Sequence, residues 1–224
     1  LSSSSAASDV YKRQVNIRRG AINPDQPRGA QLRDMRTRFD VVSHDERLPI
    51  TGRLGAIDIN AVGLHNIRNA LAACAVGLCL GMRFPMIAEG LRQFDGVQRR
   101  MQVCGDVNGI TVIEDYAHHP TEIAGTLEAA RWAAPKRIVC VFQPHLFSRT
   151  KFFREEFAQA LADADRALVT DIYPSREAPM PGVDAGMIVD AAHESGARHV
   201  ELIRDMDAVP ELLAPTLAPG DLVL

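Results

Sequence analysis

Residues 110–122 read ITVIEDYAHHPTE, and this stretch carries the pattern that decides the fold. A β-rich run ends in an acid at Glu114, and Pro120 fits the first position of a following helix. The same alternation continues outward, with strand-like runs at 100–104, 137–142, 166–170, 199–203 and 221–224 and helical stretches at about 120–134, 150–163, 184–195 and 206–214. This order predicts an α/β unit with a largely parallel sheet, in which ligands gather at the carboxyl ends of the strands.

The residues before this unit follow another pattern. Short strand-like runs are expected at 39–42 and 56–59. Apolar residues with helical spacing begin at His65, and a second helix is expected from about Pro85 to Arg92. Residues 1–96 hold 13 basic and 9 acidic side chains, whereas residues 97–224 hold 12 basic and 19 acidic ones. The change in sign predicts two units with a boundary near residues 94–96.

Composition excludes several classes of protein. The 224 residues are 46% apolar and 24% charged, so the chain can bury a core. The formal charge of -3 argues against a surface for nucleic acid or anionic membrane. No apolar run approaches the roughly 20 residues that span a bilayer, and four cysteines without a CxxC pair fit a reducing compartment. We therefore expect a soluble, cytoplasmic protein.

Both ends have unusual sequences. Residues 1–14, LSSSSAASDVYKRQ, are rich in serine and lack the order of a signal peptide. They are similar to translated adapter or tag sequence and are left out of the fold argument. Residues 220–224 form a turn and the start of an apolar strand, so we expect a fragment that is cut at both ends.

Three segments have residues suited to chemistry. Asn66 and Asn69 lie three apart at the start of a helix and could bracket a purine edge or a phosphate oxygen. The alternative is that Asn66 caps the helix and Asn69 is solvated. In 115–122, Asp115 could accept hydrogen bonds from ribose hydroxyls, and the adjacent histidines could be ligand-binding groups or one cap and one packed ring.

The third segment, FQPHLFSRT at 142–150, follows an apolar strand. Arg149 fits a carboxylate clamp, because its guanidinium fork matches two oxygens. Pairing with Glu155 or Glu156 is the alternative. The segment at 171–182 has the composition of an ordinary loop. Metal binding is not expected, since adjacent histidines rarely bind one ion and no third ligand has suitable spacing.

Together these segments resemble the Mur ligases, the ATP-dependent amide-forming enzymes of bacterial peptidoglycan synthesis. The resemblance rests on HNIRN at 65–69, GVQRR at 96–100, DYAHHPTE at 115–122 and FQPHLFSRT at 142–150, in the family's order. The last two, with DIYPSREAPMPGV at 171–183, are similar to the members that join L-alanine to UDP-N-acetylmuramate.

The resemblance implies a domain organisation. Residues 15–95 would be the C-terminal part of a central ATP-binding domain, and residues 96–224 a truncated Rossmann-like C-terminal ligase domain. Asn66, Asn69, Arg100 and Asp115 would bind ATP, whereas Tyr116, His118, His145 and Arg149 would bind the amino acid, with His118 and Arg149 catalytic. Mg²⁺ is implied, with its ligands outside this chain. The chain contains no GxxxxGK[ST] and only three lysines, so it is expected to be inactive alone.

Two positions depart from the family pattern. Val62 stands where many relatives have proline, and Leu146 stands where some have a second arginine, which leaves Arg149 with more of the carboxylate pairing. Two alternatives stay open at this point. One is the recycling ligase that attaches a tripeptide to UDP-N-acetylmuramate, and the other is a non-catalytic α/β module that binds a nucleotide or an amino acid.

Overall fold

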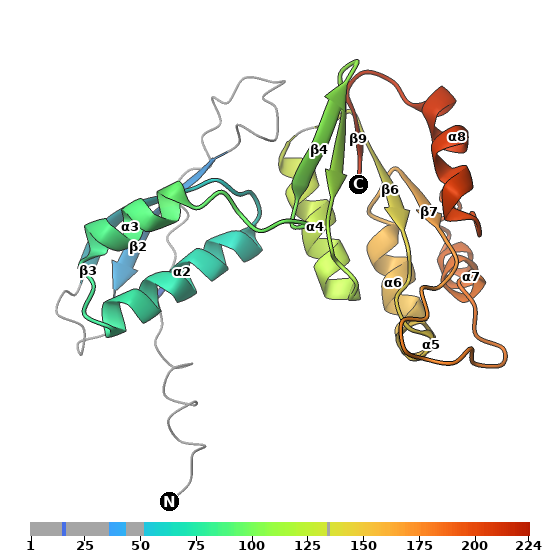
Figure 1. Ribbon diagram of the computed structural model, residues 1–224, viewed down its shortest axis with the longest axis horizontal. Helices are drawn as coiled ribbons and strands as arrows, with labels where there is room; N and C mark the ends of the chain where they lie inside the picture. Colours follow the sequence, from blue (N-terminus) through green and yellow to red (C-terminus); the bar gives the residue numbers. More distant parts are fainter. Residues whose placement is uncertain (1–14, 17–35, 44–51, 134) are drawn as a thin grey trace, which may run out of the picture. The chain divides into compact units, whose positions relative to one another are not determined.

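A computed structural model describes residues 15–16, 36–43, 52–133 and 135–224. The segment at 1–14, interpreted as artefact, lies outside the described residues. The chain divides into two compact units, Leu1–Gly96 and Val97–Leu224 (Figure 1), and each is described by itself.

The described part of the first unit is an antiparallel sheet with two helices. Its elements are β1 (Val15–Asn16), β2 (Thr37–Ser43), β3 (Gly52–Ile59), α2 (Leu64–Cys79) and α3 (Phe84–Gln93). These confirm the strands and helices expected here. Alternate residues of β2 are buried, including Phe39 and Val41, because one face of the sheet is covered.

Gly55 allows α3 to pack closely on β3. Its φ of +146° disfavours other residues, and a Cβ there would lie 2.7 Å from Cε1 of Phe84, the first residue of α3. The pairing of β2 with β3 shifts register beside this point, between Val41 and Val42. A side chain at residue 55 would therefore force the helix away from the sheet.

The second unit contains a six-stranded sheet in the order β4-β5-β9-β6-β7-β8. In Figure 1 the red β9 lies between the green β4–β5 pair and the yellow β6. Only β4 is antiparallel to its neighbour, which confirms the α/β class with a largely parallel sheet. The strand bounds are β4 Gln102–Val107, β5 Ile110–Glu114, β6 Arg137–Phe142, β7 Arg166–Val169, β8 Val200–Leu202 and β9 Asp221–Val223.

Helices cover both faces of this sheet. One face carries α4 (Pro120–Trp132), α6 (Arg154–Leu161) and α7 (Gly186–Glu194), and the other carries α8 (Val209–Leu213). The ring of Phe142 packs on that of Phe157 in α6, with centroids 5.2 Å apart. Val139 points the opposite way along the same strand and packs with Val209 of α8. The alternation of one strand thus builds both layers of the core.

Two predicted helices are broken in the structure. The stretch expected at 150–163 consists of α5 (Phe147–Phe152) and α6, with Phe153 at the break. The stretch expected at 206–214 begins as a 3-10 turn before α8. None of the described helices has the length and apolar character needed to cross a membrane.

The sheet brings three loops to one edge. The loops that follow β5, β6 and β7 all leave the carboxyl ends of parallel strands. These loops carry residues 115–119, 143–146 and 170–185. In parallel sheets this edge is where ligands bind, so the fold places all three segments where a site is expected.

Candidate functional site

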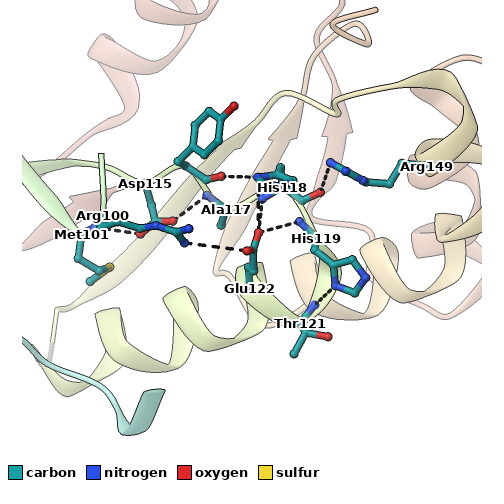
Figure 2. A network of polar contacts seen from close by, with 10 residues as sticks. Arg100, Met101, Asp115, Ala117, His118, His119, Thr121, Glu122 and Arg149 are labelled. Carbon is teal, nitrogen blue, oxygen red and sulfur yellow. Dashed lines mark hydrogen bonds and ion pairs between the residues drawn. The ribbon is translucent and has the colours of Figure 1, made fainter. Parts of the chain in front are cut away.

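The loop after β5 ends in a capping box for α4 (Figure 2). The backbone N–H of Thr121 donates to Nδ1 of His119 at 3.3 Å, and Pro120 takes the first helical turn, as predicted. Glu122 Oε2 accepts the backbone N–H groups of His118 at 3.0 Å and His119 at 3.2 Å. Burial opposes ionisation of Glu122, but these bonds and nearby positive charge hold its pKa below the ordinary 4.5.

The surroundings of His118 set its tautomer. Nδ1 lies 2.8 Å from the carbonyl oxygen of Tyr116 and 3.5 Å from Oε2 of Glu122. Both neighbours are acceptors, so we assign the proton to Nδ1. In the neutral ring, Nε2 then carries a lone pair that can accept a proton.

Arg149 joins the loops after β5 and β6. Its Nη1 donates to the backbone carbonyl of His118 at 3.2 Å (Figure 2). The ring of His145 lies 6.2 Å from that of His118, and the ring of Tyr116 packs edge-on against His118 at 5.1 Å. The structure therefore brings together all four residues predicted for the amino-acid pocket. Glu155, one of the two alternative partners for Arg149, pairs instead with Arg154 at 3.3 Å.

The surroundings of His145 favour its neutral imidazole. Burial lowers its pKa below 6.5, and the positive charge of Arg149 and the proximity of His118 lower it further. Its Nδ1 is buried and has no hydrogen-bond partner among the described residues. The ring stacks on Tyr173, with centroids 5.7 Å apart.

Two residues that the sequence reasoning missed lie in the third loop. Tyr173 donates its backbone N–H to Pro144, and Glu177 accepts from Ser148 at the start of α5. The segment had the composition of an ordinary loop. The available signal was the start of α5 itself, because a helix preceded by Leu146 has no capping residue of its own and needs one from elsewhere.

Asp115 holds a strained turn. Its Oδ2 accepts the backbone N–H of Met101 at 2.9 Å, and its Oδ1 accepts that of Ala117 at 2.7 Å. Arg99 and Met101 have φ of 59° and 47°, in the left-handed region. Arg100 lies between them and points an exposed guanidinium to within 4.0 Å of Glu122 (Figure 2). Asp115 thus has a structural task, and its ribose contact stays a prediction.

The two asparagines lie in the first unit, on the first two turns of α2. The N-cap of this helix is Gly63, so the alternative in which Asn66 is the cap is wrong. Asn66 instead donates from Nδ2 to the carbonyl of Val62 at 2.8 Å, and Asn69 is exposed. Because the two units are described separately, a meeting with Arg100 and Asp115 stays a prediction.

The described residues contain no group of three or more His, Cys, Asp or Glu side chains placed to hold a metal ion. We therefore assign no metal ligand to them.

Comparison with known proteins gives consistent matches. The profile described as "Mur ligase, glutamate ligase domain" matches residues 99–224. The chain is 45% identical over 219 residues to UDP-N-acetylmuramate–L-alanine ligase of Salinibacter ruber, covering 96% of this chain and 44% of the relative. It is 46% identical over 172 residues to the enzyme of that name from Desulforamulus reducens, covering 77% of this chain and 37% of the relative. The chain thus spans less than half the length of these relatives.

Solved structures agree with the sequence matches. The UDP-N-acetylmuramate–alanine ligase MurC of Thermotoga maritima has a TM-score of 0.65 at 28% identity, covering 85% of this chain and 40% of that one. The murein peptide ligase Mpl of Psychrobacter arcticus has a TM-score of 0.58 at 26% identity, covering 83% of this chain and 38% of that one. The family profile matches more than half of this chain, and the motifs at 115–122 and 142–150 lie at one edge of the sheet; the chain belongs to the Mur ligase family.

Proposed function

We propose that the chain is part of an ATP-dependent ligase that joins L-alanine to UDP-N-acetylmuramate in bacterial peptidoglycan synthesis. Curated relatives of that name are 45–46% identical to it. The family chemistry suggested by the motifs activates the muramoyl carboxylate as an acyl phosphate. The amine of L-alanine then attacks the acyl carbon, an amide bond forms, and phosphate leaves. We place this reaction in the bacterial cytoplasm.

The contact of Arg149 with the His118 carbonyl is the observation that carries the proposal. This bond uses one N–H of a guanidinium that has five, so the fork can still address two carboxylate oxygens. It also fixes the guanidinium at the meeting point of two motif loops. A small amino acid has little surface beyond its charged groups, so a fixed clamp for its carboxylate is the main means of selecting it.

His118 and His145 divide the remaining work in the amino-acid pocket. The ammonium of L-alanine must lose a proton before its nitrogen can attack, and Nε2 of His118 can accept that proton. The lowered pKa of His145 favours its neutral form, which adds no positive charge that would repel the ammonium. We assign Tyr116 to the wall of the same pocket, where its ring packs on His118.

The proposed nucleotide contacts are Arg100 and Asp115 in the second unit and Asn66 and Asn69 in the first. Arg100 offers an exposed positive charge suited to a phosphate. Each carboxylate oxygen of Asp115 accepts one backbone N–H and keeps a lone pair for a ribose hydroxyl. These residues therefore fit ATP. When bound, ATP supplies the phosphoryl group and Mg²⁺ offsets its charge; no described residue is assigned to the metal.

A hybrid ligase, in which this chain is joined to the remainder of the Salinibacter ruber relative, tests the proposal. We expect ATP-dependent formation of UDP-N-acetylmuramoyl-L-alanine, detected by mass spectrometry. The likeness to the murein peptide ligase makes a tripeptide the competing substrate. Product from the tripeptide and none from L-alanine would replace the proposal with the recycling ligase. Nucleotide binding without either product would favour a non-catalytic module.

A further inference from the structure

The start of α5 is capped from a distant loop. Leu146 is the N-cap residue and has no side-chain oxygen. Glu177, 29 residues beyond Ser148, accepts the backbone N–H of Ser148 at 2.9 Å and also accepts its hydroxyl. An unpaired N–H at a helix start lowers stability, and a charged acceptor makes one of the stronger hydrogen bonds. Glu177 therefore takes the place of the missing cap.

The turn before α5 is strained and held by the same loop. Leu146 has a φ of 75°, which is unusual for a residue with a side chain. Its backbone N–H donates to the carbonyl of Tyr173 at 3.0 Å, and the N–H of Tyr173 donates to the carbonyl of Pro144 at 2.8 Å. Such a conformation persists only where neighbours fix it, and here Tyr173 does so.

The loop at 171–184, which we name the brace loop, is tied at both ends. Arg204 donates to Asp171 and to Asp184, each at 3.1 Å, and the N–H of Asp171 donates to the Arg204 carbonyl at 3.2 Å. These ion pairs are exposed and individually weak. Together they restrain the loop, because one side chain binds both of its ends. They therefore help to fix the position of Glu177.

We propose that Glu177 is a positioning residue for the amino-acid clamp: it fixes Ser148, and through the first turn of α5 it sets Arg149. This inference rests on the proposed function. A helix of six residues is not stable by itself, so the direction of Arg149 depends on what holds its first turn. A small displacement of the Arg149 guanidinium weakens binding strongly, because this group must contact both oxygens of the substrate carboxylate at once.

The test uses Glu177→Ala in the hybrid ligase. We expect the KM for L-alanine to rise about tenfold, while the KM for ATP stays within about twofold. Glu128→Ala is the matched control, because Glu128 is an exposed glutamate on α4 of the same unit. It should leave both KM values unchanged.

Glu177→Gln covers the case in which the alanine variant folds poorly. The amide oxygen can still accept the Ser148 N–H, and the amide N–H can donate to the Ser148 hydroxyl, so the KM for L-alanine should rise only about threefold. A double-mutant cycle of Glu177→Ala with Arg149→Ala distinguishes positioning of Arg149 from a general structural role. In the Arg149→Ala background, Glu177→Ala should have no further effect on that KM.

The outcomes separate the two proposals. If the parent hybrid makes no product from L-alanine, the proposed function fails before Glu177 is tested. If the parent is active, an unchanged KM for L-alanine in Glu177→Ala overturns the positioning role. Equal increases in the KM values for L-alanine and ATP, or additive losses with Arg149→Ala, overturn it as well.

Discussion

In the proposed function, Arg149 is the residue that binds the substrate carboxylate, because Leu146 supplies no charge beside it. Arg149→Lys in the hybrid ligase keeps one positive charge but loses the fork. The kcat/KM for L-alanine should fall by a factor that corresponds to about 1–2 kcal/mol of transition-state stabilisation. Arg149→Ala should cost more. L-alaninamide, which lacks the carboxylate, should be a poor substrate whose rate barely changes with the mutation. Steady-state kinetics with both substrates check this, and simple addition of the two losses would contradict the clamp.

Substitution of Asp115 distinguishes a structural role of this residue from a role in ligand binding. Asp115→Ala leaves the N–H groups of Met101 and Ala117 without their acceptor, so we expect a loss of about 1–3 kcal/mol in the free energy of unfolding of the second unit. Urea denaturation of the chain measures this. In the hybrid ligase the KM for ATP should rise about tenfold or more. A rise in the KM for ATP with an unchanged free energy of unfolding would show that Asp115 acts in nucleotide binding and not in stability.

At the level of elements, the cap of α4 gives stability a pH dependence. The pKa of Glu122 is lowered in the folded state, so its carboxylate stabilises the fold above the ordinary value of 4.5. That contribution is lost as the pH falls through the lower folded-state pKa. We expect the melting temperature to decline below about pH 4.5, and Glu122→Gln to melt lower at pH 7 and to decline less. Thermal melts at pH 3–7 check both.

Prediction of the elements from sequence was successful where local signals decide the structure. The apolar runs of β5 to β7, and Pro120 after an extended loop, locate strands and a helix start without knowledge of the fold. The break at Phe153 was missed, because the α5 turn is fixed by the distant brace loop. Glu177 was missed for the same reason. The proximity of the loops after β5 and β6 could be predicted, because the strand ends of a parallel sheet share an edge. The backbone contacts of Asp115 depend on a left-handed turn that composition does not reveal.

At the level of the whole molecule, an ion pair between Arg137 and Asp221 joins β6 to β9 in the second unit. Asp221 accepts from Arg137 and from the backbone N–H of Ala218, and its side chain is 4% exposed. Asp221→Asn should reduce the free energy of unfolding of this unit by about 1–3 kcal/mol. This loss is smaller than that expected for a fully buried ion pair, because Arg137 is partly exposed to solvent. Urea denaturation measures it. Asp58→Asn, at an exposed pair in the first unit, is the control and should change stability by less than about 1 kcal/mol.

The central place of β9 also has a consequence during synthesis. β5 ends at Glu114 and β9 begins at Asp221, roughly a hundred residues later. At about 5–20 residues per second, the ribosome needs about 5–20 s to make the intervening chain. From the synthesis of β6 until that of β9, the nascent protein carries β5 and β6 without the strand that joins them, each with an unpaired edge. Those two edges are where a chaperone that recognises extended backbone would bind the growing chain, and where two nascent chains on one messenger would first aggregate.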